Sequence, residues 1–188
     1  MELAKILKKI NFKNINLGTK QELLSILQIR NEEKIRNNMF NNDLIKVDDH
    51  LNWFNKIKNS QQNFFYIIEY SNKIIGGLGL NNIHKEKNSA EWAFYISQNI
   101  NLLGLGALIE YKAIDYFFQN FDLFCLNCNV MKHNHSVIKL HKKFGFKTVA
   151  KQEKFYTNIR QKESIFFSLK LSEWIKVKKK FEVNFLKI

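Results

Sequence analysis

The first part of the chain alternates polar loops with segments of helical spacing. Thr19 followed by Glu22 matches a capping box, and leucines at helical spacing come next, which predicts a helix over residues 20–30. A polar loop then leads to a second helical segment, VDDHLNWFNKIKNS, for which we expect Asp48 to be the cap. Two helices are therefore expected before the first strand.

Runs rich in β-branched and aromatic residues occupy the middle of the chain. They are NFFYIIEY, KIIGGLGL and SAEWAFYIS, and their composition is typical of strands. Ser71 and Asn72 separate the first two runs and suit a tight turn, so we expect an antiparallel hairpin followed by a third strand.

The remainder of the chain returns to helical spacing and then to strands. The segment LGLGALIEYKAIDYFFQNF predicts a helix whose start is marked by Gly104 and Gly106. The strand LFCLNCNVM follows, and Asn134 can cap a further helix that ends at Gly145. FKTVAKQEKFYT and KESIFFSLKL are interpreted as a closing pair of strands. This order predicts an α/β fold with a mixed central β-sheet flanked by helices.

The length of 188 residues suits one domain, and no repeat or low-complexity linker marks a second one. We expect a single domain over residues 1–171 and a basic and apolar extension over residues 172–188. The extension fits a packed element, a homodimer contact or an amphipathic surface segment. Packing is the interpretation that we favour.

Composition restricts the partners and the location of the protein. No run approaches the roughly 18 apolar residues that a membrane helix needs, and the amino terminus has no signal-peptide pattern, so we expect a cytoplasmic protein without a membrane span. The formal net charge is +13, but the lysines are scattered, so no nucleic-acid partner is expected. A polyphosphate ligand would still benefit from this charge.

Cysteines and histidines raise the question of metal or redox chemistry. Cys125 and Cys128 form a C-x-x-C motif inside a predicted strand, where side chains three positions apart point to opposite faces. We therefore expect neither a disulfide nor a zinc site there. A site built from His133, His135 and His141 is a competing idea, but His133 and His135 flank the predicted cap, His141 lies nearly two turns onward, and no nearby carboxylate completes the set, so no metal is expected.

A loop with two glycines lies between a predicted strand and a predicted helix. It reads NLLGLGA over residues 101–107, and its glycines let backbone amides approach a ligand closely. Such a loop can bind pyrophosphate, although a glycine pair at a helix start more often reflects turn geometry alone.

A second pattern occupies the segment NHSVIKLHKKFGF, residues 134–146. It resembles the pattern of the GNAT superfamily, which has Asn, Ala three residues later, Tyr seven later and a terminal Gly-Phe pair. The resemblance covers about residues 64–169, with Asn101 in place of the customary Gln or Arg that opens the loop. It implies the GNAT fold and an N-acetyltransferase with acetyl-CoA as donor and no metal.

The GNAT resemblance also implies a coenzyme A site. Backbone amides of the loop would bind the pyrophosphate, the strand that ends near Ile96 would pair with the pantetheine arm, and Asn134 would contact that arm. The loop residues concerned are Leu103, Gly104, Leu105, Gly106 and Ala107.

Two residues are candidates for proton transfer. His141 stands where the family usually has a Tyr that protonates the departing thiolate, and imidazole can do the same; the alternative is a core histidine. The attacking amine needs a base near the third strand. Glu91, a carboxylate in an otherwise apolar strand, is our candidate, and a partly solvated edge position is the alternative.

The amino-terminal half of the sequence restricts the choice of acceptor substrate. The segments IRNEEKIRNNMF, IKVDDHLNWF and IGGLGLNNI resemble the pseudaminic-acid pathway N-acetyltransferases, so that the similarity covers residues 23–169. This resemblance implies acetylation of a UDP-amino sugar, UDP-4-amino-4,6-dideoxy-N-acetyl-β-L-altrosamine, at its 4-amino group, a step toward a nonulosonic acid that decorates flagellin. Arg30 and His50 would bind the nucleotide sugar, and an apolar cradle would hold uracil or sugar. The cradle residues are Met39, Phe40 and Trp53.

Other interpretations remain open. Arg30 also fits a solvated helix end, and the cradle residues fit an ordinary core. A glutamate of some relatives corresponds to Asn129 here, so its role cannot be transferred. The acceptor could also be another amino sugar, a ribosomal protein amino terminus or an aminoglycoside, and a noncatalytic module that binds acyl-CoA or nucleic acid is the alternative from another class.

Overall fold

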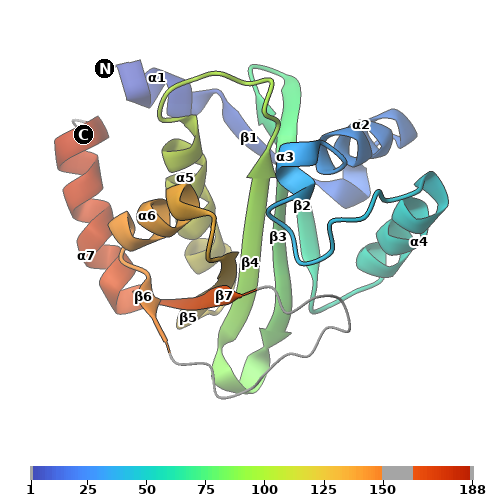
Figure 1. Cartoon of the computed structure of the whole chain (residues 1–188). Coiled ribbons are helices and arrows are strands. Elements are labelled where there is room, and N and C mark those ends of the chain that lie inside the picture. Colours follow the sequence, from blue (N-terminus) through green and yellow to red (C-terminus); the bar gives the residue numbers. More distant parts are fainter. Residues whose placement is uncertain (1, 150–162, 187–188) are drawn as a thin grey trace.

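The computed structural model describes residues 2–149 and 163–186, and in these parts of the chain helices cover both faces of a central sheet (Figure 1). The strands lie in the order β1-β2-β3-β4-β5-β7-β6. Their bounds are β1 Ile10–Asn14, β2 Phe64–Tyr70, β3 Lys73–His84, β4 Ser89–Ile96, β5 Cys125–Met131, β6 Lys147–Thr148 and β7 Ser164–Lys170. β4 and β5 pair in parallel and the other neighbours pair antiparallel, so the expected mixed sheet is confirmed.

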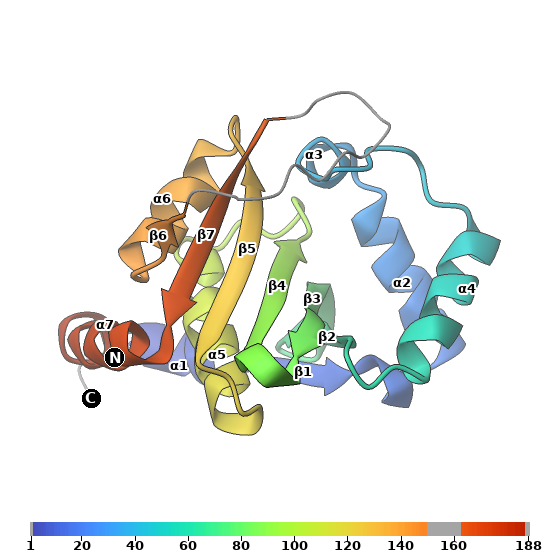
Figure 2. The same cartoon turned by 90° about the horizontal axis from the view of Figure 1, so that it is seen from below.

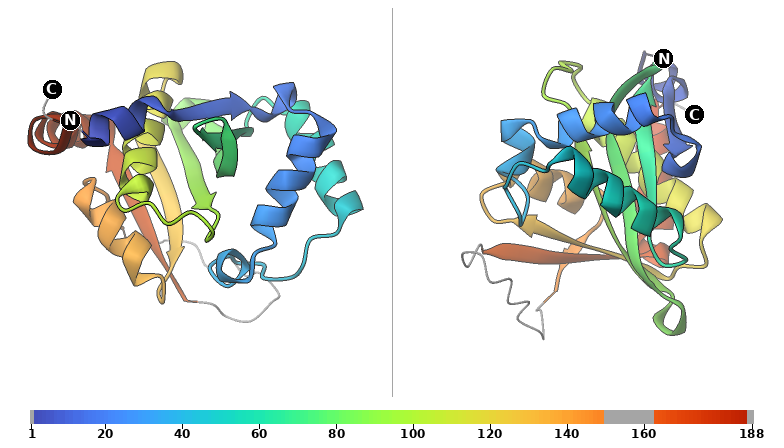
Figure 3. Two further views of the ribbon diagram at one scale, coloured as in Figure 1. Left: turned by 90° about the horizontal axis from the view of Figure 1, so that it is seen from above. Right: turned by 90° about the vertical axis from the view of Figure 1, so that its right-hand side faces the viewer.

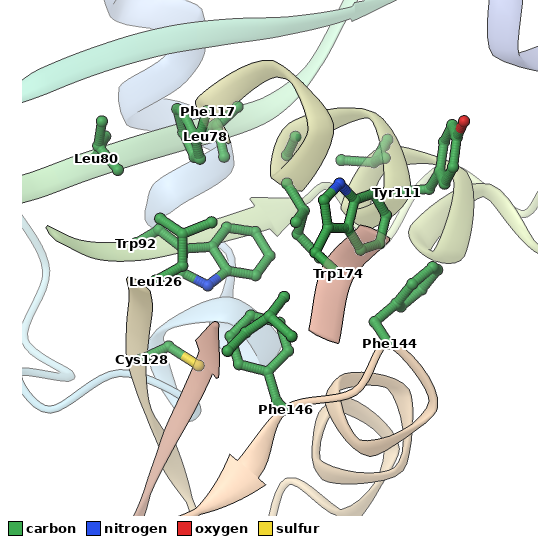
Figure 4. Close-up of a cluster of buried hydrophobic side chains, with 14 of the residues drawn as sticks. Leu78, Leu80, Trp92, Tyr111, Phe117, Leu126, Cys128, Phe144, Phe146 and Trp174 are labelled. Atoms are coloured by element: carbon green, nitrogen blue, oxygen red, sulfur yellow. The ribbon is translucent and has the colours of Figure 1, made fainter. Parts of the chain in front are cut away.

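The helices form a layer on each side of the sheet (Figure 2 and Figure 3). One side carries α1 Glu2–Lys8, α5 Leu105–Asn120, α6 His135–Lys143 and α7 Leu171–Phe181; the other carries α2 Lys20–Arg30 and α4 Val47–Lys58, with the short α3 Glu33–Arg36 after α2. Single turns η1 Ile15–Leu17, η2 Lys85–Lys87 and η3 Glu182–Leu186 complete the elements. The larger core lies under α5, α6 and α7 and contains Trp92, Phe117 and Trp174 (Figure 4). A smaller core lies under α2 and α4.

Local sequence signals explain where α2 begins. Thr19 Oγ1 accepts a hydrogen bond from Glu22 N at 3.3 Å, and the Glu22 carboxylate accepts one from Thr19 N at 2.7 Å, so the predicted capping box is confirmed. The predicted cap of α4 is wrong, because Lys46 occupies the cap position without a side-chain bond and Asp48 lies in the first turn. A carboxylate in the first turn interacts favourably with the helix dipole, which accounts for Asp48 without a capping role.

The hairpin of β2 and β3 has the predicted turn. Ser71 and Asn72 have φ values of 49° and 64°, and two left-handed residues suit a two-residue hairpin loop. No sequence pattern described above predicts α1 or β1. β1 is an edge strand that places Ile10 opposite Tyr70 of β2, and its five residues are too few to show a strand pattern.

The carboxyl-terminal segment packs against the rest of the protein. α7 places Trp174 and Phe181 in the larger core, with 1% and 5% of their surface exposed, so the packing expected of this tail is confirmed. Asp115 of α5 accepts hydrogen bonds from Trp174 Nε1 at 3.3 Å and from Lys178 Nζ at 2.7 Å. No helix within the two described ranges is long and apolar enough to cross a membrane.

The closing pair of strands is only partly described. β6 and β7 pair antiparallel, with Lys147 opposite Ser168. Much of the predicted run FKTVAKQEKFYT lies at residues 150–162, outside the described residues.

Candidate active site

The site lies where two neighbouring strands separate. β4 pairs with β5 only from Ser89 to Glu91, opposite Cys125 to Asn127. Beyond this point the two strands diverge, as Figure 2 shows, and a cavity of about 360 Å³ lies between residues 92–96 of β4 and residues 128–131 of β5. The end of the parallel ladder at Glu91 therefore creates the opening.

The other walls of the cavity come from three further elements. Gly106 at the start of α5 contributes to one wall, and Asn134 and His141 of the α6 region contribute to another. The segment from α3 onward adds Lys34 and Met39. Residues from both layers of helices thus meet at one gap in the sheet.

The side of β4 that faces this gap is an open strand edge. Its ladder with β3 continues to Ile96, whereas its ladder with β5 ends at Glu91. Backbone amide and carbonyl groups at such an edge can pair with an extended ligand that carries amides of its own. Ile96, which we predicted at the end of this strand, lines the cavity.

The start of α5 brings unpaired backbone amides close to the same cavity. Gly104 is the cap residue with φ of 82°, a left-handed conformation that glycine adopts at little cost. A Cβ at position 106 would have Ile96 Cδ1, at 4.0 Å, as its nearest described neighbour, so packing does not require glycine there. The first amides of a helix have no intrahelical acceptor and favour an anion. Of the predicted loop residues, Leu103 is exposed, Leu105 is buried, Ala107 is half-buried and Gly106 lines the cavity.

Asn134 has two tasks in the structure. Its Oδ1 accepts hydrogen bonds from Val137 N at 3.4 Å and from Ser136 Oγ at 3.0 Å, so the predicted cap of α6 is confirmed. The side chain also lines the cavity. Because Oδ1 serves the cap, Nδ2 is the group that can donate to a ligand.

His141 lies in the cavity wall, and its Nδ1 contacts a buried carboxylate. Its Nδ1 is 2.7 Å from Oε1 of Glu110, with 4% of His141 and none of Glu110 exposed. Burial raises the pKa of the Glu110 carboxyl, and the hydrogen bond and charge of His141 act in the opposite direction. Glu110 was not among the predicted site residues. The available signal was a carboxylate on the apolar side of a helix, between Ile109 and Tyr111.

Glu91 lies at the closed end of the gap. It is half-buried, stands opposite Asn127 in the last rung of the ladder and is not part of the cavity lining. Burial, followed by the charges of Glu110 and Glu91, raises the pKa of the Cys128 thiol in the cavity wall. Glu91 is thus close enough to influence the wall electrostatically.

Of the five predicted acceptor-binding residues, the structure brings only Met39 to the cavity lining. Phe40 is 42% exposed. His50 Nε2 is 3.0 Å from the carbonyl oxygen of Leu23, and the His50 ring stacks on Trp53 at 5.1 Å. Burial lowers the pKa of His50. These contacts connect α4 to α2 and to the smaller core.

Arg30 lies at the end of α2, next to the cavity residue Tyr95. Its Nη2 donates to the Asn41 carbonyl at 3.3 Å, while its buried Nη1 has no hydrogen-bond partner among the described residues. Burial lowers the pKa of Arg30 and raises that of Tyr95, and the charge interaction between the two opposes both shifts. Arg30 is not among the residues that line the cavity, and Nη1 is covered by protein, so the structure places this donor beside the cavity but not in contact with it.

The cysteines and the possible metal-ligating side chains are placed as follows in the described residues. These contain no group of three or more His, Cys, Asp or Glu side chains able to hold a metal ion. Cys125 and Cys128 are both free thiols. Cys125 Sγ is 2.8 Å from Ser168 Oγ of β7, whereas Cys128 is buried in the larger core (Figure 4), so the two side chains point away from each other as predicted.

Comparisons with known proteins agree with this geometry. Residues 15–163 match the model of the acetyltransferase (GNAT) domain family. The acetyltransferase PseH of Campylobacter jejuni subsp. jejuni serotype O:23/36 (strain 81-176) is 26% identical over 155 residues, which cover 82% of this chain and 95% of that protein.

Solved structures that share the fold include two acetyltransferases with bound ligands. Campylobacter jejuni N-acetyltransferase PseH in complex with acetyl coenzyme A has a TM-score of 0.66 and 22% identity, and the match covers 86% of this chain and 99% of that chain. Spermidine N-acetyltransferase from Vibrio cholerae in complex with CoA and spermine has a TM-score of 0.77 and 19% identity, with 89% and 99% covered. These likenesses confirm the expected fold.

Proposed function

The chain belongs to the GNAT acetyltransferase family and is an N-acetyltransferase that uses acetyl-CoA, and from this premise we propose that it acetylates the 4-amino group of a UDP-linked 4-amino-4,6-dideoxy sugar. The acceptor implied by the resemblance to the pseudaminic-acid pathway N-acetyltransferases is UDP-4-amino-4,6-dideoxy-N-acetyl-β-L-altrosamine. Such a reaction would serve pseudaminic acid biosynthesis and flagellin glycosylation, with both substrates drawn from the cytoplasm.

The geometry of the gap supports a definite position for acetyl-CoA. Its pantetheine arm carries two amides and would extend the sheet along the open edge of β4, from Trp92 to Ile96. Its pyrophosphate would then lie against the first amides of α5 beside Gly106. Asn134 would donate from Nδ2 to the pantetheine arm.

The observation that carries the acceptor assignment is the chemistry of the cavity lining. Lys34, Asn38 and Met39 form the wall next to α2, and no Asp or Glu is found among the described residues of the lining. A positive and amide-bearing wall suits a diphosphate, and a thioether suits a flat heterocycle. Similarity over 95% of PseH supports the same acceptor.

A polyamine is the acceptor that the fold comparison would suggest instead, because spermidine N-acetyltransferase has the higher TM-score. A polycation needs carboxylates around it, since like charges repel in a partly buried site. Lys34 and the absence of acids from the described lining disfavour it.

The proposed chemistry is direct transfer within a ternary complex. The amine nitrogen attacks the thioester carbon while an amide of the open β4 edge polarises the carbonyl oxygen. Collapse of the tetrahedral adduct breaks the C–S bond, and His141 gives a proton to the thiolate. Glu91, through water because it does not line the cavity, accepts the proton that the amine loses.

The test is an assay of the purified protein with acetyl-CoA and a panel of UDP-amino sugars and polyamines, with free thiol and product mass measured together. The proposal predicts thiol release and a mass gain of one acetyl group on the 4-amino sugar. Acetylation of spermidine alone would reject the sugar, and acetyl-CoA binding without turnover on any amine would favour the noncatalytic alternative.

A further inference from the structure

We propose that Glu110 is a positioning residue for the transfer reaction: its buried carboxylate holds Nδ1 of His141 so that Nε2 faces the cavity and delivers the proton to the leaving thiol. This inference rests on the proposed function of His141. It assigns a role to a residue that no sequence motif marks.

The burial of Glu110 requires an explanation. The side chain is fully buried in α5, a helix that contributes Leu108, Ile109 and Phe117 to the larger core. A buried carboxylate is costly unless it is paired, and a residue that served packing alone would be apolar. His141 is the partner of one oxygen, and the other oxygen has no hydrogen-bond partner among the described residues. Stability alone therefore does not account for this pair.

The orientation of the imidazole follows from its contacts. The rings of Trp92, Phe146 and Phe167 lie 5.5, 5.0 and 6.0 Å from the His141 ring and pack around it. Glu110 accepts from Nδ1 at 2.7 Å, and the second nitrogen lies on the other side of the ring. Because His141 also lines the cavity, Nε2 is the nitrogen available to a ligand.

The Glu110–His141 pair is neutral overall when the two side chains share one ionisable proton beyond the Nδ1 or Nε2 proton of neutral imidazole. Carboxylate with imidazolium and carboxylic acid with imidazole are both neutral overall, so burial tolerates either form better than a lone charge. Two titratable groups on the neighbouring strands are Cys128 of β5 and Glu91 of β4; the charges of Glu110 and Glu91 both raise the pKa of the Cys128 thiol. The packed rings from β4, β7 and the turn after α6 carry no charge.

Every proton is accounted for when the thiol leaves. When the C–S bond breaks, the sulfur keeps the electron pair, and the Nε2–H of the imidazolium gives its proton to sulfur. His141 is left neutral, with the Nδ1 proton retained on the hydrogen bond to Glu110. The proton released by the amine passes to solvent through the base, and solvent returns one to Nε2 before the next turnover.

The variant Glu110→Gln tests this role, because it keeps the shape and removes the charge. We expect kcat to fall about 10- to 100-fold, with KM for acetyl-CoA changed less than about threefold. A carboxylate stabilises the imidazolium, so the alkaline limb of the kcat profile should move to lower pH by about one unit or more. In a ¹⁵N NMR titration, the signals of the His141 imidazolium should give way to those of the neutral ring at lower pH than in the wild-type protein, because the amide oxygen of Gln still accepts from Nδ1–H but carries no negative charge.

Asp115→Asn is the matched control, because Asp115 is another hydrogen-bonded carboxylate of α5, whose partners are Trp174 and Lys178. It should lower stability and leave the pH profile and the His141 signals unchanged. Wild-type kcat, pH profile and His141 signals in Glu110→Gln would overturn the proposal. The NMR titration needs no acceptor, so a failure of the sugar assignment would remain distinguishable from a failure of the pairing.

Discussion

Glu91 and Asn127 form the last rung of the parallel ladder between β4 and β5. From the next residue onward, the two strands supply opposite walls of the cavity. The position at which this ladder ends therefore determines where a ligand can reach the backbone of β4. His141 and Asn134 of the α6 region lie at the same gap.

Two substitutions of Asn134 separate its contribution to protein stability from its contribution to acetyl-CoA binding. Asn134→Ala should reduce the free energy of unfolding by about 1 kcal/mol, because α6 loses its cap. It should also raise KM for acetyl-CoA. Asn134→Ser keeps an acceptor for the cap but lacks Nδ2, so urea unfolding should return to near the wild-type value while KM stays raised. Recovery of both quantities in the Ser variant would limit Asn134 to capping.

Gly106 tests the position of the coenzyme. A Cβ there meets no described atom closer than 4.0 Å, so Gly106→Val should fold with little loss of stability. The added methyl groups would project into the space assigned to the coenzyme, and we expect the Kd for coenzyme A to rise about tenfold, a change of about 1.4 kcal/mol. Calorimetric titration measures it, with Leu17→Ala, at an exposed site, as the control. An unchanged Kd would place the coenzyme elsewhere.

His141 should affect turnover more than binding. His141→Phe keeps a ring in the aromatic surroundings and removes the proton donor, so kcat should fall about 100-fold or more while the Kd for coenzyme A stays within about threefold of wild type. Stopped-flow thiol detection and calorimetry provide the two values. Equal losses in both would indicate that His141 shapes the wall and transfers no proton.

The tail should contribute strongly to stability. Trp174→Ala removes a side chain that is 1% exposed, and we expect a loss of about 3–5 kcal/mol in the free energy of unfolding. Its neighbour Ile175 is 61% exposed, so Ile175→Ala should cost about 0.5 kcal/mol or less. Denaturant titration compares the two. Similar small losses would mean that α7 is a dispensable extension.

Much of the fold follows from local signals in the sequence. The capping box of α2, the Ser71-Asn72 turn and the Asn134 cap each depend on residues within a few positions of one another, and the structure confirms them. The cap residue of α4 cannot be predicted from the sequence in the same way, because an aspartate in the first turn and an aspartate at the cap position give similar sequences.

The site is less predictable where it depends on tertiary contacts. Glu110 and His141 are 31 residues apart in the chain and meet only after α5 and α6 have packed on the same face of the sheet. His50 suited a ligand-binding role by residue type, but its ring nitrogen is used by the carbonyl of Leu23, 27 residues away. Pairwise distances of this kind are set by packing and have no local pattern.

The most direct test of the account is a competition measurement: kcat/KM of the wild-type protein for UDP-4-amino-4,6-dideoxy-N-acetyl-β-L-altrosamine and for spermidine in one acetyl-CoA reaction, with product masses resolved. A lining with Lys34 and without described acids predicts a ratio in favour of the sugar of about 100-fold or more. A ratio in favour of spermidine would contradict the assignment of this cavity to a nucleotide-linked amino sugar.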